Sequence, residues 1–204
     1  MKPLSGNLWK QGENKVYQDV IIAGFGGQGV LLIGNVLAQA AMEAGQNVTF
    51  MPVYGVEMRG GTANCTVVVS DEEIGSPVIH APLSLIVMNQ PSLSKFQPRL
   101  RSNGVLVVNS SLVEREQIPQ DKEQIVVSIP ANDLANELGS VKMANIVALG
   151  AWTQATCALP LQSVRDVVGS IFASKGESVL QANDQALLRG AEWAESLVKA
   201  SEAS

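Results

Sequence analysis

The feature that most limits how this chain can fold is a glycine-rich segment near its start, residues 19–34, which read DVIIAGFGGQGVLLIG. The apolar run before the glycines predicts a short buried strand, and the run after them predicts a helix. Gly24, Gly26 and Gly29 have the spacing of a dinucleotide-binding loop, in which backbone N–H groups at a helix start bind phosphate. Glycines are equally expected where a strand turns tightly into a helix without any ligand. The segment therefore predicts a strand–turn–helix unit and leaves its ligand open.

The rest of the chain continues this alternation and then becomes helical. Strands are expected at residues 19–24, 47–51, 64–70, 83–89, 104–110 and 123–130. Helices are expected at 30–44, 90–100 (a short crossover), 131–139, 142–157, 160–174 and 177–200. This order predicts an α/β fold: a three-layer Rossmann-like domain with a mostly parallel sheet and a helical C-terminal part. Residues 1–15 are expected to form a flexible tail and residues 16–204 a single domain.

Two local features refine this prediction. The helix at 30–44 should end at Gly45, and the strand after it should lie parallel to the first strand through a right-handed crossover. Residues 52–63, PVYGVEMRGGTA, interrupt the alternation with four proline and glycine residues. We expect a loop there, and one with a function, because it also carries aromatic and charged side chains.

Composition excludes several classes of protein. The formal net charge of −5 gives no basic footprint for a nucleic acid, and no apolar run is long enough to span a membrane. The polar N-terminus lacks the apolar core of a signal peptide, so a cytoplasmic location is expected. Charged residues make up only 16% of the chain, which favours burial against partner subunits or in a dimer over a compact, apolar monomer. Two cysteines and one histidine cannot supply an iron–sulfur cluster or a multi-histidine metal site.

The segment after the glycine loop argues against a nicotinamide or flavin dinucleotide. Those ligands require an acidic residue at the end of the second strand, about 20 residues on, to bind the ribose. The expected second strand ends at Met51–Pro52 with no carboxylate, and Glu57 lies deeper in the following loop. Arg59 is also too far along to bind the extra phosphate of NADP. A phosphate-bearing anion remains the expected ligand.

Three motifs taken together resemble one family. AGFGGQGV, MPVYGVEMRGGTANCTVVVSDEEIGSPVI and LIVMNQPSLSKF are similar to the gamma subunit of 2-oxoacid:ferredoxin oxidoreductases, chiefly the 2-oxoglutarate and branched-chain types. The resemblance runs from about Asp19 to the C-terminus and is dense through Ser111. It implies an enzyme complex that decarboxylates a 2-oxoacid on thiamine diphosphate, passes electrons through [4Fe–4S] clusters to external ferredoxin and releases an acyl-CoA.

The resemblance also implies a division of labour. Alpha and beta subunits would hold thiamine diphosphate and magnesium, a ferredoxin-like subunit or domain would hold the clusters, and this chain would help bind coenzyme A. No GDG-type motif for thiamine diphosphate is present in this chain. We expect the CoA diphosphate to lie on the glycine loop, at Gly24, Phe25, Gly26, Gly27, Gln28 and Gly29. This chain would not be active alone.

Further candidates for the CoA site come from other loops. Tyr54, Glu57 and Arg59 lie in the 52–63 loop, where the charged pair either contacts the ligand or fixes the loop against the alpha subunit. Asn89 and Gln90 follow a strand, at the edge where α/β proteins bind ligands, or else bond to their own backbone. Asn145, at the start of a helix, could point toward the same site, although a structural role is the more common one.

The remaining reactive side chains are expected to be structural. Cys65 and Cys157 are predicted to be buried as small apolar side chains, and His80, in a proline-flanked connector, has no visible partner. Trp152 and Trp193 are expected to pack within the fold or at an interface. This chain is therefore predicted to support catalysis without supplying a nucleophile or general acid.

Three other functions share some of these sequence features. An indolepyruvate oxidoreductase beta subunit shares the glycine loop and would differ in turning over aryl 2-oxoacids. A stand-alone module that binds CoA or a nucleotide would be a stable monomer with a more polar surface. An ordinary NAD-dependent reductase lacks the strand-end acid.

Overall fold

A computed structural model describes residues 16–54, 62–120 and 123–202. The strands are β1 (Tyr17–Phe25), β2 (Asn47–Tyr54), β3 (Thr62–Ser70), β4 (Ser84–Val87), β5 (Val105–Asn109) and β6 (Ile125–Ile129). The α-helices are α1 (Val30–Glu43), α2 (Gln90–Phe96), α3 (Ala131–Glu137), α4 (Ala144–Thr156), α5 (Leu161–Phe172) and α6 (Glu177–Glu202). Short 3₁₀ turns are η1 (Gln97–Arg99), η2 (Arg115–Gln117), η3 (Val141–Met143) and η4 (Ala173–Lys175). The predicted elements are confirmed in type and order; the predicted tail, residues 1–15, lies outside the described residues.

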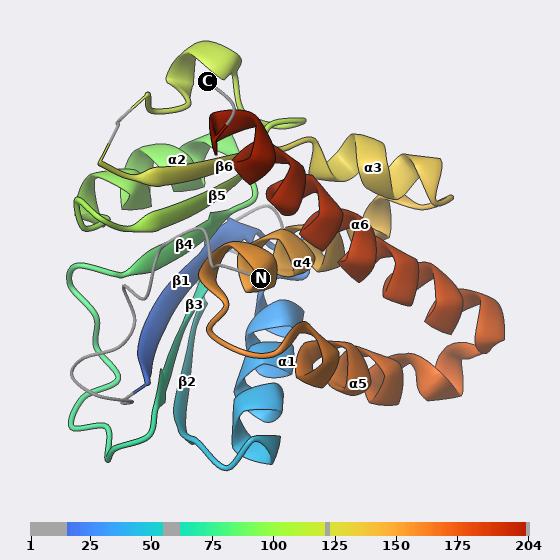
Figure 1. Ribbon diagram of the computed structural model, residues 1–204, viewed down its shortest axis with the longest axis horizontal. Coiled ribbons are helices and arrows are strands. Elements are labelled where there is room, and N and C mark those ends of the chain that lie inside the picture. Colours follow the sequence, from blue (N-terminus) through green and yellow to red (C-terminus); the bar gives the residue numbers. More distant parts are fainter. Residues whose placement is uncertain (1–15, 55–61, 121–122, 203–204) are drawn as a thin grey trace.

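The six strands form one sheet in the order β2-β3-β1-β4-β5-β6. β1, β4, β5 and β6 are parallel neighbours, and β3 is antiparallel to both β1 and β2. The predicted mostly parallel Rossmann-like α/β sheet is therefore confirmed (Figure 1). At its centre, β4 and β5 are buried along their whole length because helices or loops cover both faces.

The predicted pairing of the first two strands is wrong. β2 runs in the direction of β1 but does not touch it, because β3 lies between them and pairs with both. The reason is the β2–β3 hairpin. The segment after β2 is too short for a crossover, so β3 folds back antiparallel and its free edge pairs with β1. The predicted loop at 52–63 is also shorter than expected. Pro52–Tyr54 extend β2 and Thr62–Ala63 extend β3.

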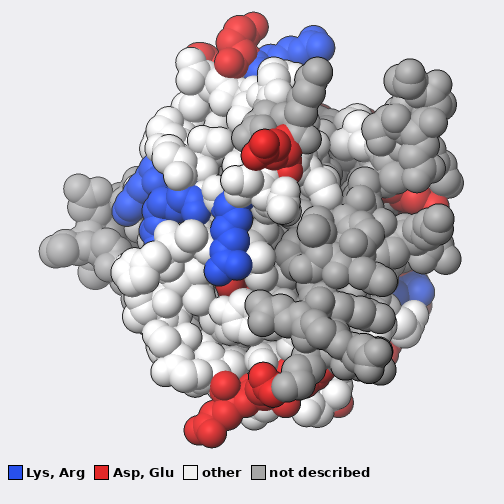
Figure 2. All heavy atoms as spheres, turned by 60° about the vertical axis from the view of Figure 1, so that its left-hand side comes forward, with Lys and Arg blue, Asp and Glu red and all other residues white. Residues whose placement is uncertain are grey.

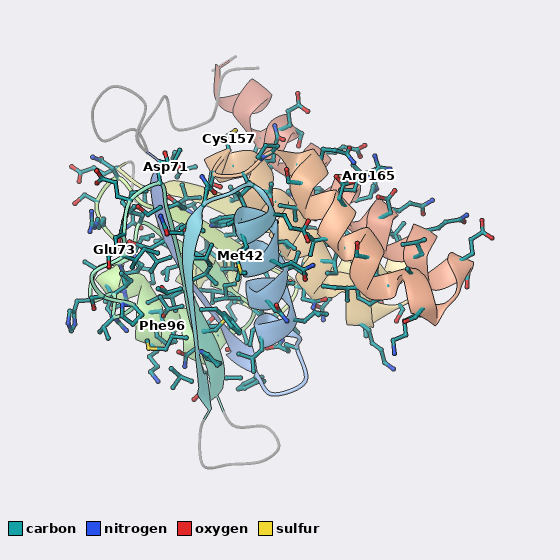
Figure 3. The ribbon with its side chains drawn as sticks, turned by 90° about the horizontal axis from the view of Figure 1, so that it is seen from below. Met42, Asp71, Glu73, Phe96, Cys157 and Arg165 are labelled. Atoms are coloured by element: carbon teal, nitrogen blue, oxygen red, sulfur yellow. The ribbon has the colours of Figure 1, made fainter. Side chains whose placement is uncertain are left out.

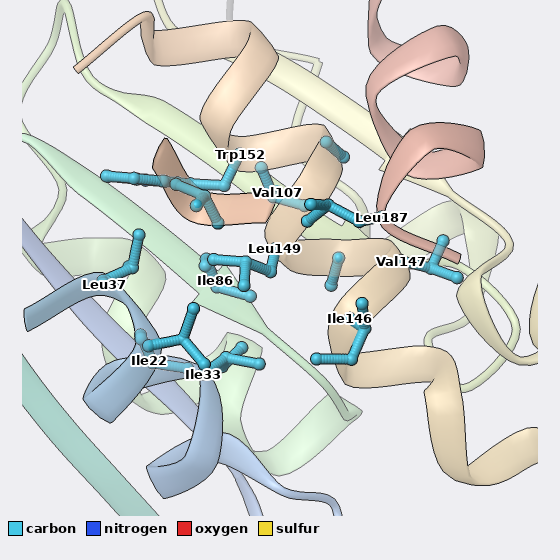
Figure 4. Packing of buried hydrophobic residues seen from close by; sticks show 14 of the residues in the cluster. Ile22, Ile33, Leu37, Ile86, Val107, Ile146, Val147, Leu149, Trp152 and Leu187 are labelled. Atoms are coloured by element: carbon cyan, nitrogen blue, oxygen red, sulfur yellow. The ribbon is translucent and has the colours of Figure 1, made fainter. Parts of the chain in front are cut away.

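The two faces of the sheet are covered unequally. One face packs against α1, α3, α4, α5 and α6, and the main apolar core lies there. Ile22, Ile86 and Val107 of the sheet meet Ile33, Leu149 and other residues of these helices (Figure 4). The other face carries α2, and its smaller core includes Leu93 and Phe96. The two faces complete the predicted three layers.

On the α2 face, basic side chains hold the connector between β3 and β4 in place. Arg99 donates hydrogen bonds to the backbone oxygens of Ile79 and His80, and Arg101 donates to that of Ala81. Figure 2 shows Lys and Arg side chains gathered on the face of the molecule that it brings forward. In Figure 3, Phe96 lies on the opposite side of the sheet from Arg165 of α5. Arg99 and Arg101 therefore stabilise the fold, and His80 lies exposed on the connector that they hold in place.

A buried polar network fastens α4 to the sheet. The Ser84 hydroxyl donates to the Asp19 carbonyl and accepts from Gln18 Nε2 and from the indole N–H of Trp152 at 2.9 Å. Trp152 is 1% exposed, and the Trp193 indole donates to the Ser128 carbonyl. Both tryptophans thus pack within the fold, as predicted.

The stability of the fold is expected to depend on pH through the carboxylate of Asp19. Its carboxylate is fully buried and accepts a 2.7 Å hydrogen bond from the Leu83 N–H. Burial raises the pKa of Asp19, although the Leu83 hydrogen bond and the charge of Arg101 oppose the rise. Because its pKa is higher in the folded chain, the stability that Asp19 contributes is fully present at acidic pH. That contribution is lost as the pH rises through the folded pKa.

We therefore expect Asp19→Asn to stabilise the chain at pH 7–8 and to have little effect near about pH 3, where most Asp is protonated even when unfolded. The asparagine oxygen can still accept from Leu83 and carries no charge to desolvate. Thermal unfolding between about pH 3 and about pH 8 measures this, and about 1 kcal/mol corresponds to about 2–4 °C in a domain of this size. A variant that differs from the parent equally at every pH would contradict the assignment.

Candidate functional site

The glycine loop joins the carboxyl end of β1 to α1. Gly24 still belongs to β1, and the turn is closed by the Gln28 N–H, which donates to the Phe25 carbonyl at 3.1 Å. Gly27 has φ 99° and Gly29 has φ 71°, values that side-chain-bearing residues rarely adopt. A Cβ on Gly27 would have no atom within 4 Å, and Gly26 and Gly27 are exposed. The tip of the loop is therefore bare backbone open to solvent.

Gln28 clamps this loop onto the neighbouring strand β4. Its Oε1 accepts from the Phe25 N–H at 2.6 Å and from Asn89 Nδ2 at 2.8 Å, and its Nε2 donates to the Met88 carbonyl at 3.1 Å. Both polar atoms of Gln28 are thus used inside the protein. β1 and β4 are the strands at which the direction of the connections changes, and parallel α/β sheets bind ligands at the carboxyl ends of such strands.

The start of α1 carries positive potential with no side chain to neutralise it. Its N-cap is Gly29, which offers no capping side chain, and the first turn contains no acidic residue. The first helical hydrogen bond runs from the Ile33 N–H to the Gly29 carbonyl, so the three preceding N–H groups have no partner within the helix. Such an end attracts an anion, which completes these bonds and interacts favourably with the helix dipole.

Asn145 reaches the loop from the start of α4. Its Nδ2 donates to the Gly29 carbonyl at 3.2 Å, across 116 residues of sequence. A Cβ added to Gly29 would lie 2.2 Å from that nitrogen, so the contact requires glycine. Asn145 is 3% exposed, and its Oδ1 has no hydrogen-bond partner among the described residues. The expectation that Asn145 could point toward the site thus agrees with its position.

The structure brings only some of the predicted site residues together. Asn89 lies against Gln28, and its Oδ1 caps α2 by accepting from the Ser92 N–H at 3.0 Å. Gln90 accepts from the Glu114 N–H at 3.3 Å, on the α2 side. Tyr54 ends β2, in the same row of paired residues as Gly24. Glu57 and Arg59 lie outside the described residues. As ligand contacts, all of these remain predictions.

Sequence reasoning missed Asn109. It ends β5 at the same edge of the sheet, is fully buried, and accepts from the N–H groups of Ser111 and Ala131. A signal was present, because both LIVMN and VLVVN end a buried strand with asparagine. The two asparagines hold the loops that follow β4 and β5, and so shape the edge of the sheet beside the glycine loop.

The two cysteines differ in burial, and only the prediction for Cys65 is confirmed. Cys65 is buried, its thiol donates to the Val30 carbonyl at 3.5 Å, and burial raises its pKa to about 12, so it is not a nucleophile. The prediction for Cys157 is wrong. It is exposed because it ends α4 in a left-handed conformation, φ 51°, at the surface (Figure 3).

Among the described residues, no group of three or more His, Cys, Asp or Glu side chains could hold a metal ion. No helix in the described part of the chain has the length and apolarity to cross a membrane.

Comparison with known proteins gives a consistent result. The model of the family described as pyruvate ferredoxin/flavodoxin oxidoreductase matches residues 19–193. Ketoisovalerate oxidoreductase subunit VorA of Methanothermobacter marburgensis is 38% identical over 177 residues. That match covers 86% of this chain but only 36% of VorA, so the chain spans about a third of this relative.

Two solved structures share the fold. The gamma subunit of a keto/oxoacid ferredoxin oxidoreductase from Geobacter sulfurreducens superposes with a TM-score of 0.74 at 28% identity, over 88% of this chain and 99% of that one. The 2-oxoglutarate:ferredoxin oxidoreductase from Magnetococcus marinus, with 2-oxoglutarate, coenzyme A and succinyl-CoA bound, gives a TM-score of 0.78 at 25% identity. That match covers 90% of this chain and 32% of the other.

Proposed function

This chain belongs to the pyruvate ferredoxin/flavodoxin oxidoreductase family, and on that premise we propose that it is the gamma subunit of a 2-oxoacid:ferredoxin oxidoreductase. The complex would oxidatively decarboxylate a 2-oxoacid and release an acyl-CoA. This chain would contribute to CoA binding and to assembly with alpha, beta and ferredoxin-like subunits. The resemblance noted in the three sequence motifs supports the same family.

The observation that carries the CoA part of the proposal is the uncapped start of α1 behind a loop of bare backbone. Coenzyme A carries a diphosphate, which two or more adjacent N–H groups at a helix start can bind. No carboxylate in the first turn of α1 opposes that charge. β2 has no acidic residue for a ribose either, which disfavours a nicotinamide dinucleotide. The bound CoA and succinyl-CoA in the Magnetococcus marinus relative add support.

Gln28, Asn89 and Asn145 have a different role in this proposal. Their polar atoms bond to the loop and its neighbours, so they position the backbone that would contact the diphosphate. The N–H groups of Gly26, Gly27, Gly29, Val30 and Leu31 would make the contacts themselves, since that of Gln28 is already bonded to the Phe25 carbonyl. Fixed donors bind an anion better than mobile ones because less conformational entropy is lost on binding.

The other cofactors are assigned to partner subunits. The chain has two cysteines, one buried and one exposed, where a [4Fe–4S] cluster requires four thiolates. We therefore place the clusters, thiamine diphosphate and magnesium on the other subunits, with the 16–204 domain as a docking and CoA-binding unit of a cytoplasmic complex. The substrate is proposed to be 2-oxoglutarate, as named for the Magnetococcus marinus relative, with the branched-chain 2-oxoacid named for VorA as the alternative.

Affinity purification of the tagged chain from its own cells, under anaerobic conditions, tests this function. We expect brown, cluster-bearing partners to co-purify and the eluate to reduce viologen only when both CoA and one 2-oxoacid are present. Comparing 2-oxoglutarate, branched-chain and aryl 2-oxoacids identifies the substrate and separates the indolepyruvate type. A colourless, solitary protein without this activity would contradict the proposal and favour a stand-alone CoA- or nucleotide-binding module.

A further inference from the structure

The strand β2 forms a free edge of the sheet (Figure 1). At the opposite edge, the Ser128 carbonyl of β6 accepts from the Trp193 indole, so α6 covers that strand. β2 has no such cover among the described residues, and its Phe50 and Val53 are 37% and 43% exposed. A long uncovered edge is a template for pairing with another strand, and proteins commonly protect it with charged side chains. β2 carries none, since its sequence is NVTFMPVY.

The hydrogen bonds of the sheet show which backbone groups of β2 face outward. In the β1–β3 ladder the Asp71 N–H donates to the Val16 carbonyl, which makes these opposite residues a hydrogen-bonded pair. Because such pairs alternate along an antiparallel ladder, the even-numbered residues of β3 bond to the odd-numbered residues of β2. Val48 and Phe50 therefore point their N–H and carbonyl groups to the free edge, where no described group bonds to them. Pro52 also faces outward, a position that a strand tolerates for proline.

The surface around this edge is almost free of charge. Residues 30–54, which include α1 and β2, contain one charged residue, Glu43. Met42 is 65% exposed on α1, the helix that packs beside β2 (Figure 3). Exposed apolar side chains on a surface without charges are typical of the centre of a protein–protein interface.

We propose that two copies of this chain pair through β2, antiparallel about a two-fold axis at Thr49, and so join their sheets into one. In this register Val48 of each copy lies opposite Phe50 of the other, and each donates to and accepts from its counterpart. Pro52 lies opposite Gln46, whose N–H is already bonded within its own copy, so the proline costs no hydrogen bond. A register centred on Phe50 would instead place Val48 opposite Pro52 and leave the Val48 carbonyl without a donor.

The distribution of charge favours a second copy as the occupant of this edge. The nearby acidic residues Glu43 and Asp71 lie at the end of β2 that begins with Asn47, whose Nδ2 donates to the Asp71 carbonyl. Antiparallel pairing about Thr49 separates the two Asn47 residues by about 14 Å along the strands, at about 3.4 Å per residue. This exceeds the Debye length of about 8 Å, so the carboxylates of the two copies do not oppose pairing. The uncharged centre of β2 then meets an identical uncharged strand.

Sedimentation of the full chain over a series of concentrations tests the pairing without any ligand or activity. We expect a dimer, and we expect Phe50→Lys to weaken dimerisation at least about tenfold, because it buries unpaired charges beside the axis. Val78→Lys is the matched control. Val78 is 51% exposed on the connector between β3 and β4, so a lysine there should leave the dimer unchanged.

Cysteine cross-linking tests the register, and it does not depend on whether Phe50→Lys folds. The two Thr49 Cα atoms would lie about 4.5 Å apart, within the range of a disulfide. In a Cys157→Ser background, where the remaining Cys65 is buried, Thr49→Cys should cross-link two copies on oxidation. Asn47→Cys, on the same strand but about 14 Å from its counterpart, should not.

Three results would overturn this inference: a full chain that stays monomeric, equal cross-linking by Thr49→Cys and Asn47→Cys, or a folded Phe50→Lys variant that dimerises as the parent does. A monomeric chain whose Phe50→Lys variant no longer co-purifies with other subunits would assign the β2 edge to a strand of a partner subunit instead. None of these outcomes bears on CoA binding, so the proposed function is tested separately.

Discussion

Substituting Gly150 by alanine should lower the free energy of unfolding by about 3 kcal/mol, the cost of overpacking a core contact that cannot relax. Gly150 of α4 and Gly190 of α6 lie where these helices cross most closely. A Cβ on Gly150 would lie 1.9 Å from the Leu187 carbonyl oxygen, and a Cβ on Gly190 would lie 1.9 Å from the Val147 carbonyl oxygen. Both obstacles are backbone atoms, so the helices themselves would have to separate.

Thermal unfolding of the full chain measures this effect, which corresponds to about 6–12 °C in Tm for a domain of this size. Gly190→Ala should cost a similar amount because the contact is reciprocal. Gly169→Ala in α5 is the matched control, since a Cβ there would have no atom within 4 Å. Its helix should be stabilised by up to about 1 kcal/mol. A Gly150 variant as stable as the Gly169 variant would show that α4 and α6 do not cross as described.

These two glycines illustrate what the sequence could not reveal. In the sequence, Gly150 and Gly190 are isolated glycines inside helices, where glycine weakens the helix. Their purpose depends on a contact between elements 40 positions apart, which no local pattern encodes. The helices α4 and α6 themselves were predictable, because their apolar spacing is a property of each segment alone.

The same contrast between local sequence patterns and long-range contacts applies to the sheet and to the site. The strand, turn and helix around Gly29 were predictable because their signals are contiguous in the sequence. The insertion of β3 between β1 and β2 was not, because strand order follows from long-range pairing. The contact of Asn145 with Gly29 joins residues that no motif links, and Cys157 is exposed because of where its helix ends.

The second large effect is expected at the tip of the glycine loop, where a single added negative charge should weaken CoA binding. Gly27 is exposed, has φ 99°, and has free space where a side chain would project. Aspartate there would place a negative charge beside the proposed diphosphate site without a steric clash. We expect Gly27→Asp to raise the KM for CoA at least about tenfold, because like charges a few ångströms apart at a protein surface repel by more than 1.4 kcal/mol.

Gly27→Asn separates this charge effect from backbone strain. Asparagine has the shape of aspartate and tolerates a positive φ comparably, so both variants carry a similar conformational cost. We expect its KM for CoA to stay within about threefold of the parent's, since only the charge differs. In both variants the KM for the 2-oxoacid should be unchanged, because the loop is not proposed to contact that substrate.

The KM for CoA of the Gly27→Asp and Gly27→Asn complexes, purified anaerobically and assayed side by side, is the most direct test of whether the glycine loop binds coenzyme A. If the loop binds the CoA diphosphate, the KM for CoA should rise strongly for aspartate alone, and added salt should reduce this rise by screening. Equal KM values for CoA in the two variants and the parent would contradict it and would place the CoA diphosphate away from α1.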